Sequence, residues 1–119
     1  MAVGTPSTTG GSGAGTEVLR RASGSITDEQ SVLTVGSDKI VTIISLICKN
    51  EDGSGSTDLY IKAHNGTADL TWVQESGLAA GKTFVFNEKV VLTAGDVLKI
   101  VESGSVTLAY WLSYIEQEF

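Results

Sequence analysis

Near its C-terminal end the chain reads Val106-Thr107-Leu108-Ala109-Tyr110-Trp111-Leu112-Ser113-Tyr114-Ile115. β-Branched and aromatic residues dominate this run, and such residues are enriched in strands. Side chains alternate between the two faces of a strand, so one face carries every second residue from Leu108 to Tyr114 and the other carries every second residue from Thr107 to Ile115. Both faces hold large apolar side chains, which predicts a strand that is covered on both sides.

Seven further segments have a similar composition, and turn-forming residues bound each of them. They span residues 31–35, 39–48, 58–63, 70–75, 82–86, 89–92 and 97–101. Strands that recur every ~8–12 residues, with no helical segment between them, are typical of sandwiches and barrels. The sequence therefore predicts an all-β chain, an antiparallel β-sandwich of the jelly-roll kind with about eight strands.

Segment 39–48 repeats the two-sided apolar pattern. One face is expected to carry Ile40, Ile44 and Leu46, and the other Val41, Ile43 and Ile47. A sheet of a sandwich needs only one buried face. We therefore expect one sheet to be covered a second time, by another subunit or by the N-terminal residues. The alternative is a set of central strands with a few exposed apolar side chains, which is common in soluble proteins.

The N-terminal segment differs in composition from the rest of the chain. Six of the 14 glycines fall within residues 1–24, among Ser and Thr residues, so ordering this segment costs much backbone entropy and buries little. We expect an extended arm over residues 1–30 and a sandwich domain over residues 31–119. The arm is either a flexible tail or a segment that orders against a neighbouring subunit, with partner contacts at Val18, Leu19, Arg20 and Arg21.

Composition argues against several function classes. Eight Lys and Arg face 14 Asp and Glu, for a net charge of −6, which disfavours nucleic acid or an anionic membrane as the partner. One cysteine and one histidine give neither an internal disulfide nor a probable metal site. We expect Cys48 to be a buried small hydrophobe and His64 to end a strand before the Asn65-Gly66 turn. No catalytic constellation, metal or cofactor is predicted, and the chain is expected not to be an enzyme.

Three motifs point to a family. Residues 43–50 form a strand with Asn50 at its end, and residues 92–99 form a corner that reads Leu-Thr-Ala-Gly-Asp-Val-Leu-Lys. The chain closes with Leu-Ser-Tyr-Ile-Glu over residues 112–116. Together these motifs resemble a group of small β-sandwich virion proteins of tailed bacteriophages, over roughly residues 39–116. In the corner, Gly95 permits a left-handed turn and Asp96 can accept hydrogen bonds from nearby amides.

The resemblance implies a structural virion component that is made in the bacterial cytoplasm and is often oligomeric. The leading hypothesis is a capsid cement (decoration) protein, a trimer that clamps the major capsid protein through its arm. A tail, neck or fibre-attachment protein is the alternative within the virion. From another class we retain a carbohydrate-binding module, because Trp72, Tyr110 and Trp111 could form a sugar platform. The same three aromatic residues could instead pack in the core or at a subunit interface.

Overall fold

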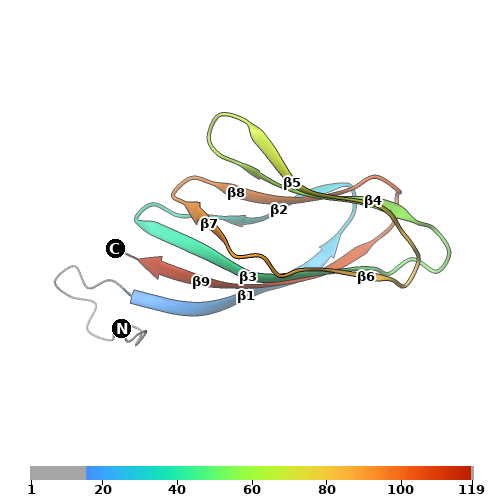
Figure 1. The fold of residues 1–119 in the computed structure, drawn as a ribbon, viewed down its shortest axis with the longest axis horizontal. Coiled ribbons are helices and arrows are strands. Elements are labelled where there is room, and N and C mark those ends of the chain that lie inside the picture. The colour runs from blue at the N-terminus through green and yellow to red at the C-terminus, as the bar shows by residue number, and fades with distance from the viewer. Residues whose placement is uncertain (1–15, 119) are drawn as a thin grey trace.

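The computed structural model describes residues 16–118, and in these residues nine antiparallel strands form two facing sheets (Figure 1). In chain order the strands are β1 (Thr16–Ile26), β2 (Glu29–Thr34), β3 (Lys39–Asn50), β4 (Thr57–His64), β5 (Asp69–Leu78), β6 (Thr83–Phe86), β7 (Val90–Thr93), β8 (Val97–Glu102) and β9 (Leu108–Glu118). The described part of the chain contains no helix. The prediction of an all-β antiparallel sandwich is confirmed, and all eight expected strands are present.

One sheet has five strands and the other has four. In the five-stranded sheet the order is β1-β9-β3, and both β6 and β7 pair with β3 beyond it. The other sheet has the order β2-β8-β4-β5. The chain therefore changes sheets between β1 and β2, through a turn in which Asp28 has a φ of 68°. Figure 1 shows the two sheets as facing layers.

The ninth strand, β1, corrects the predicted domain boundary. It pairs with β9 along its whole length, from Thr16 opposite Glu118 to Ile26 opposite Leu108. Ala22 and Ile26 face the core from this strand. Because β1 has few apolar side chains to bury, its main-chain hydrogen bonds to β9 hold it in the sheet. The predicted arm is therefore wrong for residues 16–30, which belong to the sandwich, and its remaining part, residues 1–15, lies outside the described residues.

A β-bulge corrects the predicted faces of β3. The register against β9 shifts between Ile43 and Ser45, so Ile44 is an extra residue on the bulged strand. Val41 and Ile43 are buried before the bulge, and Leu46 is buried after it, whereas Ile47 is 38% exposed. The predicted grouping of Leu46 with Ile40, and of Ile47 with Val41, was wrong because a bulge shifts the alternation by one residue.

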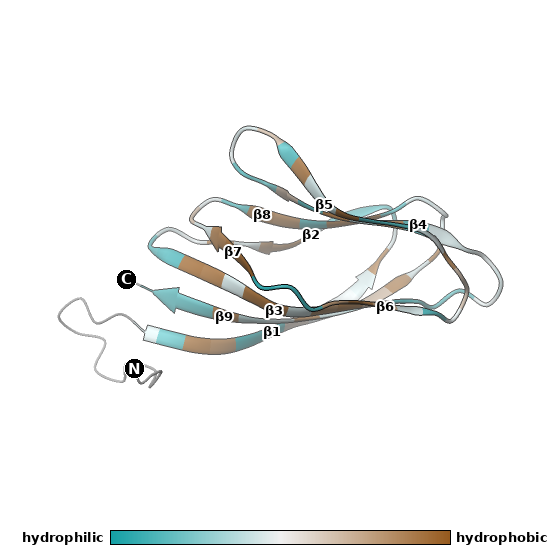
Figure 2. Cartoon of the chain, in the orientation of Figure 1, coloured by the Kyte–Doolittle hydropathy of each residue, from teal (hydrophilic) through white to brown (hydrophobic). Residues whose placement is uncertain are grey.

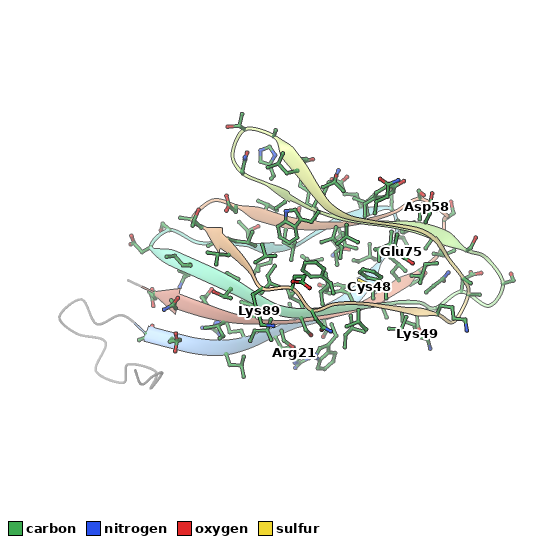
Figure 3. The ribbon with its side chains drawn as sticks, viewed as in Figure 1. Arg21, Cys48, Lys49, Asp58, Glu75 and Lys89 are labelled. Carbon is green, nitrogen blue, oxygen red and sulfur yellow. The ribbon has the colours of Figure 1, made fainter. Side chains whose placement is uncertain are left out.

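The core lies between the sheets and consists of aliphatic side chains from both. Figure 2 shows brown and teal segments along the strands, while most connecting loops are pale and the segment between β6 and β7 is hydrophilic. Cys48 is completely buried in this core, as expected (Figure 3). The predicted corner is also confirmed: Gly95 has a φ of 90°, and the Thr93 amide donates a 2.8 Å hydrogen bond to the Asp96 carboxylate.

Candidate functional site

The outer face of the five-stranded sheet, which points away from the four-stranded sheet, carries two apolar rows. Cross-strand partners lie side by side on one face of a sheet, so the register of the strands defines each row. The first row crosses β1, β9, β3 and β7 and contains Leu19, Ile115, Thr42 and Val91. The second row crosses β1, β9, β3 and β6 and contains Ser23, Trp111, Ile47 and Val85.

The apolar side chains of these rows are unusually accessible. Leu19 is 70% exposed, Val91 60%, and Trp111 and Val85 48% each. Single exposed apolar residues are ordinary on soluble proteins, but a contiguous group is more often an interaction site. The two rows therefore make the outer face of the five-stranded sheet the candidate functional site.

A polar row with cationic groups separates the apolar rows. Arg21, Ser113 and Ser45 are cross-strand partners across β1 and β9 and into β3, beside the bulge. The Arg21 guanidinium lies 4.4 Å from the centre of the Trp111 ring and donates a 3.1 Å hydrogen bond to the Ser23 hydroxyl. Arg21 projects away from the four-stranded sheet in Figure 3. This arrangement holds a guanidinium against an exposed aromatic ring.

Lys89 adds a second cation beside the bulge. Its ammonium group donates to the backbone oxygens of Ile44 and Asn87, at 3.5 and 3.2 Å. Neither Arg21 nor Lys89 forms an ion pair with a carboxylate among residues 16–118. Lys49, near the end of β3, forms an ion pair with Glu51 at 3.1 Å. The middle of the candidate site therefore presents two cations without a carboxylate partner among the described residues, and the one carboxylate that the register of β1 places on the same face, Glu17, lies beyond Leu19 at its edge.

The outer face of the four-stranded sheet is different in kind. Lys62 and Lys99 each lie between the carboxylates of Glu29 and Asp69, with N–O distances of 3.3–3.8 Å. A 2.9 Å hydrogen bond from the His64 ring, followed by the nearby lysines, lowers the pKa of Asp69 below its ordinary value. This face pairs its charges internally and suits contact with water, so the two faces of the sandwich are not equivalent.

The four residues predicted to contact a partner lie on two different faces of β1. Leu19 and Arg21 lie on the outer face with Trp111, whereas Val18 and Arg20 alternate with them and lie on the opposite face of β1. Arg20 forms a 2.8 Å ion pair with Glu116 of its own chain rather than being free for a neighbour. Its expected pairing with another subunit is therefore already satisfied internally.

The three aromatic residues do not form one platform. Trp72 on β5 packs against the core and stacks on Phe86, with ring centres 6.2 Å apart. Tyr110 is also partly buried against the core, whereas Trp111, its neighbour on β9, faces outward. A flat sugar-binding platform of all three residues, which the carbohydrate hypothesis required, is not present.

Sequence reasoning missed Glu102, which is only 3% exposed at the end of β8. Its carboxylate accepts hydrogen bonds from the amides of Asp28 (2.7 Å), Gly104 (2.9 Å) and Val106 (3.1 Å), and from the Thr57 hydroxyl (3.1 Å). Burial alone would raise the pKa of Glu102, but these hydrogen bonds outweigh it and lower the pKa below its ordinary value of 4.5.

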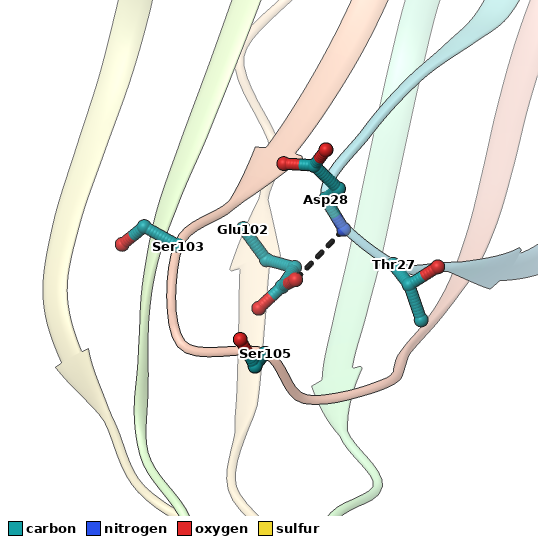
Figure 4. Close-up of a pocket in the computed structure, with 5 residues that line it drawn as sticks. All are labelled: Thr27, Asp28, Glu102, Ser103 and Ser105. Carbon is teal, nitrogen blue, oxygen red and sulfur yellow. Dashed lines mark hydrogen bonds between the residues drawn. The ribbon is translucent and has the colours of Figure 1, made fainter.

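Glu102 also lines a pocket, together with Thr27, Asp28, Ser103 and Ser105 (Figure 4). The Glu102 carboxylate accepts all of these hydrogen bonds from its own chain, and it thereby links the β1–β2 turn to the β8–β9 turn. No signal in the sequence distinguishes it from the other carboxylates, because two of its partners, the Asp28 amide and the Thr57 hydroxyl, come from distant segments of the chain. We interpret the pocket as structural.

Within residues 16–118 no three His, Cys, Asp or Glu side chains gather in a way that could hold a metal ion. The same residues include no helix with the length and hydropathy needed to cross a membrane.

Comparison with known proteins shows the fold. Neither a protein family nor a curated protein matches the sequence. A chain of the capsid structure of Helicobacter pylori bacteriophage KHP30 matches with a TM-score of 0.62 and 11% identity, over 88% of this chain and 99% of that one. A protein of Bacillus endospore appendages, a family of disulfide-linked pili, matches with a TM-score of 0.57 and 15% identity, over 92% and 94%. At these identities the two matches show the fold alone, which is the β-sandwich described above.

Proposed function

We propose that this chain is a structural protein of a bacteriophage virion, and that it acts as a capsid cement (decoration) protein on the shell of the major capsid protein. It catalyses no reaction in this role. The observation that carries the proposal is the outer face of the five-stranded sheet, whose two apolar rows remain exposed in the single chain. A cement protein works by burying such surface against its neighbours, which stabilises the shell in proportion to the apolar area covered.

Fold likeness supports the proposal. The match to the chain in the KHP30 phage capsid structure covers nearly the whole of both chains. The Bacillus pili are described as disulfide-linked, and the same linkage has no suitable group here. Cys48 is the one cysteine of this chain, it is completely buried, and burial raises its pKa to about 12. We therefore favour a virion component over a pilus subunit that is joined through disulfides.

The assembly that we propose is a trimer, formed in the bacterial cytoplasm and incorporated into the virion. Residues 1–15 are proposed to serve as the arm that reaches a neighbouring subunit, because β1 already occupies the rest of the predicted arm. Analytical ultracentrifugation tests the trimer against the chain mass of 12.4 kDa. A single species at that mass, at high protein concentration, counts against it. Removing residues 1–15 should preserve the far-UV spectrum and weaken shell binding if the arm acts as proposed.

The main experiment compares phage shells with and without this chain. Shells that lack it are incubated with the purified full chain, and their melting temperature is measured before and after. We expect a higher melting temperature and regular extra density on the outer surface by electron microscopy. Extra density confined to the neck, tail or fibres would instead support the tail or fibre-attachment alternative. No density and no change in melting would refute a virion role.

A further inference from the structure

We infer that the outer face of the five-stranded sheet docks on a protein surface that presents carboxylates between apolar side chains. This inference rests on the proposed function, in which that surface belongs to the virion shell. It specifies which face of the sandwich makes the contact and which chemistry the partner must offer.

The first step is the size of the face. A strand spacing of about 4.8 Å and a rise of about 3.4 Å per residue place the two apolar rows about 14 Å apart, across a width of about 14 Å. The first row begins at Leu19 and the second is centred on Trp111. An apolar patch of this breadth on one side of a small sandwich, with an ion-paired face on the other, points to one-sided docking.

The second step is the charge between the rows. Arg21 stacks on Trp111 at 4.4 Å, which holds its guanidinium in place while leaving N–H groups available for a carboxylate. Lys89 lies at the other end of the polar row, with its ammonium group on backbone oxygens rather than on a carboxylate. A partner that covers the apolar rows also desolvates these two cations, so it must supply acidic groups opposite them.

The third step concerns the other possible occupants. A second copy placed face to face would bring the Arg21 and Lys89 side chains of both copies into one contact, where like charges repel. Residues 1–15 contain no Asp or Glu and so cannot neutralise the cations. Charge complementarity therefore favours an acidic surface of a different protein, and it leaves the contacts of a trimer to other parts of the sandwich.

The test uses shells that lack this chain and measures co-sedimentation of the full-length protein with them. Arg21→Glu and Leu19→Asp change the outer face, and Lys62→Glu and Leu70→Asp are matched controls on the four-stranded sheet, where Leu70 is 54% exposed. Far-UV circular dichroism and a melting curve establish that each variant is folded. If Leu19→Asp does not fold, Lys89→Glu replaces it, since its side chain is exposed in a loop.

We expect each outer-face variant to bind shells at least tenfold more weakly and each control to stay within twofold of the wild type. Wild-type binding should also weaken with added salt, and less steeply in Arg21→Glu. Wild-type binding with unchanged affinity in the outer-face variants would overturn the inference and leave the proposed function intact. Self-association that is lost only in the outer-face variants would also overturn it, because the occupant would then be a second copy.

A second readout separates this inference from the proposed function. The dye bis-ANS combines apolar rings with sulfonates, and its binding is followed by the quenching of tryptophan emission, since Trp111 lies on the face. We expect binding to the wild type and to both controls, and a loss of at least tenfold in Arg21→Glu and Leu19→Asp. If wild-type protein ignores the shells but shows this dye pattern, the cement function fails while the face remains a docking surface for an anionic, apolar partner. Equal dye binding by all variants overturns the inference.

Discussion

Replacing Glu102 by Gln should destabilise the folded chain by about 3 kcal/mol at pH 7. The carboxylate accepts four hydrogen bonds, three of them from backbone amides, while being almost completely buried. Hydrogen bonds to a charged acceptor contribute about 1.5–3 kcal/mol each and neutral ones about 0.5–1.5, and an amide side chain must also turn its NH₂ toward one of the donors. The lower cost of burying a neutral side chain offsets part of this loss.

The pH dependence follows from the lowered pKa of Glu102. Because the folded-state pKa lies below the ordinary value of 4.5, the carboxylate stabilises the fold above that value, and this contribution is lost as the pH falls through the folded-state pKa. The difference between wild type and Glu102→Gln should therefore be largest near pH 7 and should shrink in acid.

Urea denaturation, followed by tryptophan fluorescence at pH 7 and at pH values below 4.5, measures both effects. Glu51→Gln is the control, because the Glu51 side chain is about half exposed and pairs only with Lys49, so its loss should be within about 0.5 kcal/mol. A Glu102→Gln variant within 1 kcal/mol of the wild type at pH 7 would refute the reasoning. So would a difference between the two proteins that does not change with pH.

Three further predictions concern stability and reactivity. Gly104→Ala should lower the free energy of unfolding by about 3 kcal/mol or more in urea denaturation, because the added Cβ would overlap the backbone carbonyl oxygen of Ser56. A Cβ added at Gly53 meets no atom within 4 Å, so Gly53→Ala should be nearly neutral, and equal stabilities of the two variants would contradict the prediction. Cys48 should react with a thiol reagent only in denaturant, since its thiol is buried and its pKa is about 12; rapid reaction of the native protein would disprove it. Asn50→Ala should lower the free energy of unfolding by about 2–3 kcal/mol, because the buried side-chain amide donates to the backbone oxygens of Gly55 and Leu78 and accepts from the Asp52 amide. Asn87 is exposed, so Asn87→Ala should change the urea midpoint little. Similar urea midpoints for the two variants would contradict the prediction.

Local patterns were sufficient to predict most of the fold. The strands that the sequence marked by β-branched and aromatic residues are all present, because propensity, alternation and turn residues agree along them. The first strand, β1, escaped prediction because few of its residues are apolar and it is held by pairing with a strand at the other end of the chain. The bulge at Ile44 escaped because nothing in the local sequence requires an extra residue there.

The candidate site was predictable only in parts. The sequence predicted Arg21 as a partner-binding cation and Trp111 as an interface aromatic residue. Their contact depends on the register between β1 and β9, which a local pattern does not encode. Glu102 gave no signal, because two of its four partners, the Asp28 amide and the Thr57 hydroxyl, reach it only in the folded chain, while the Gly104 and Val106 amides belong to the turn that follows it.

The central position of β9 in the five-stranded sheet has a consequence for biosynthesis. β9 lies between β1 and β3, so until β9 is synthesised β1 has no partner in its sheet, and β3 can pair only with β6 and β7. During translation the four-stranded sheet can form first, since β2, β4, β5 and β8 all precede β9 in the chain. Pairing of β1 with β9 then closes the longest loop of the chain, which is a slow step in folding. A nascent chain stalled before β9 should therefore present an incomplete five-stranded sheet to chaperones, and synthesis of β9 should set the time at which the sandwich is completed.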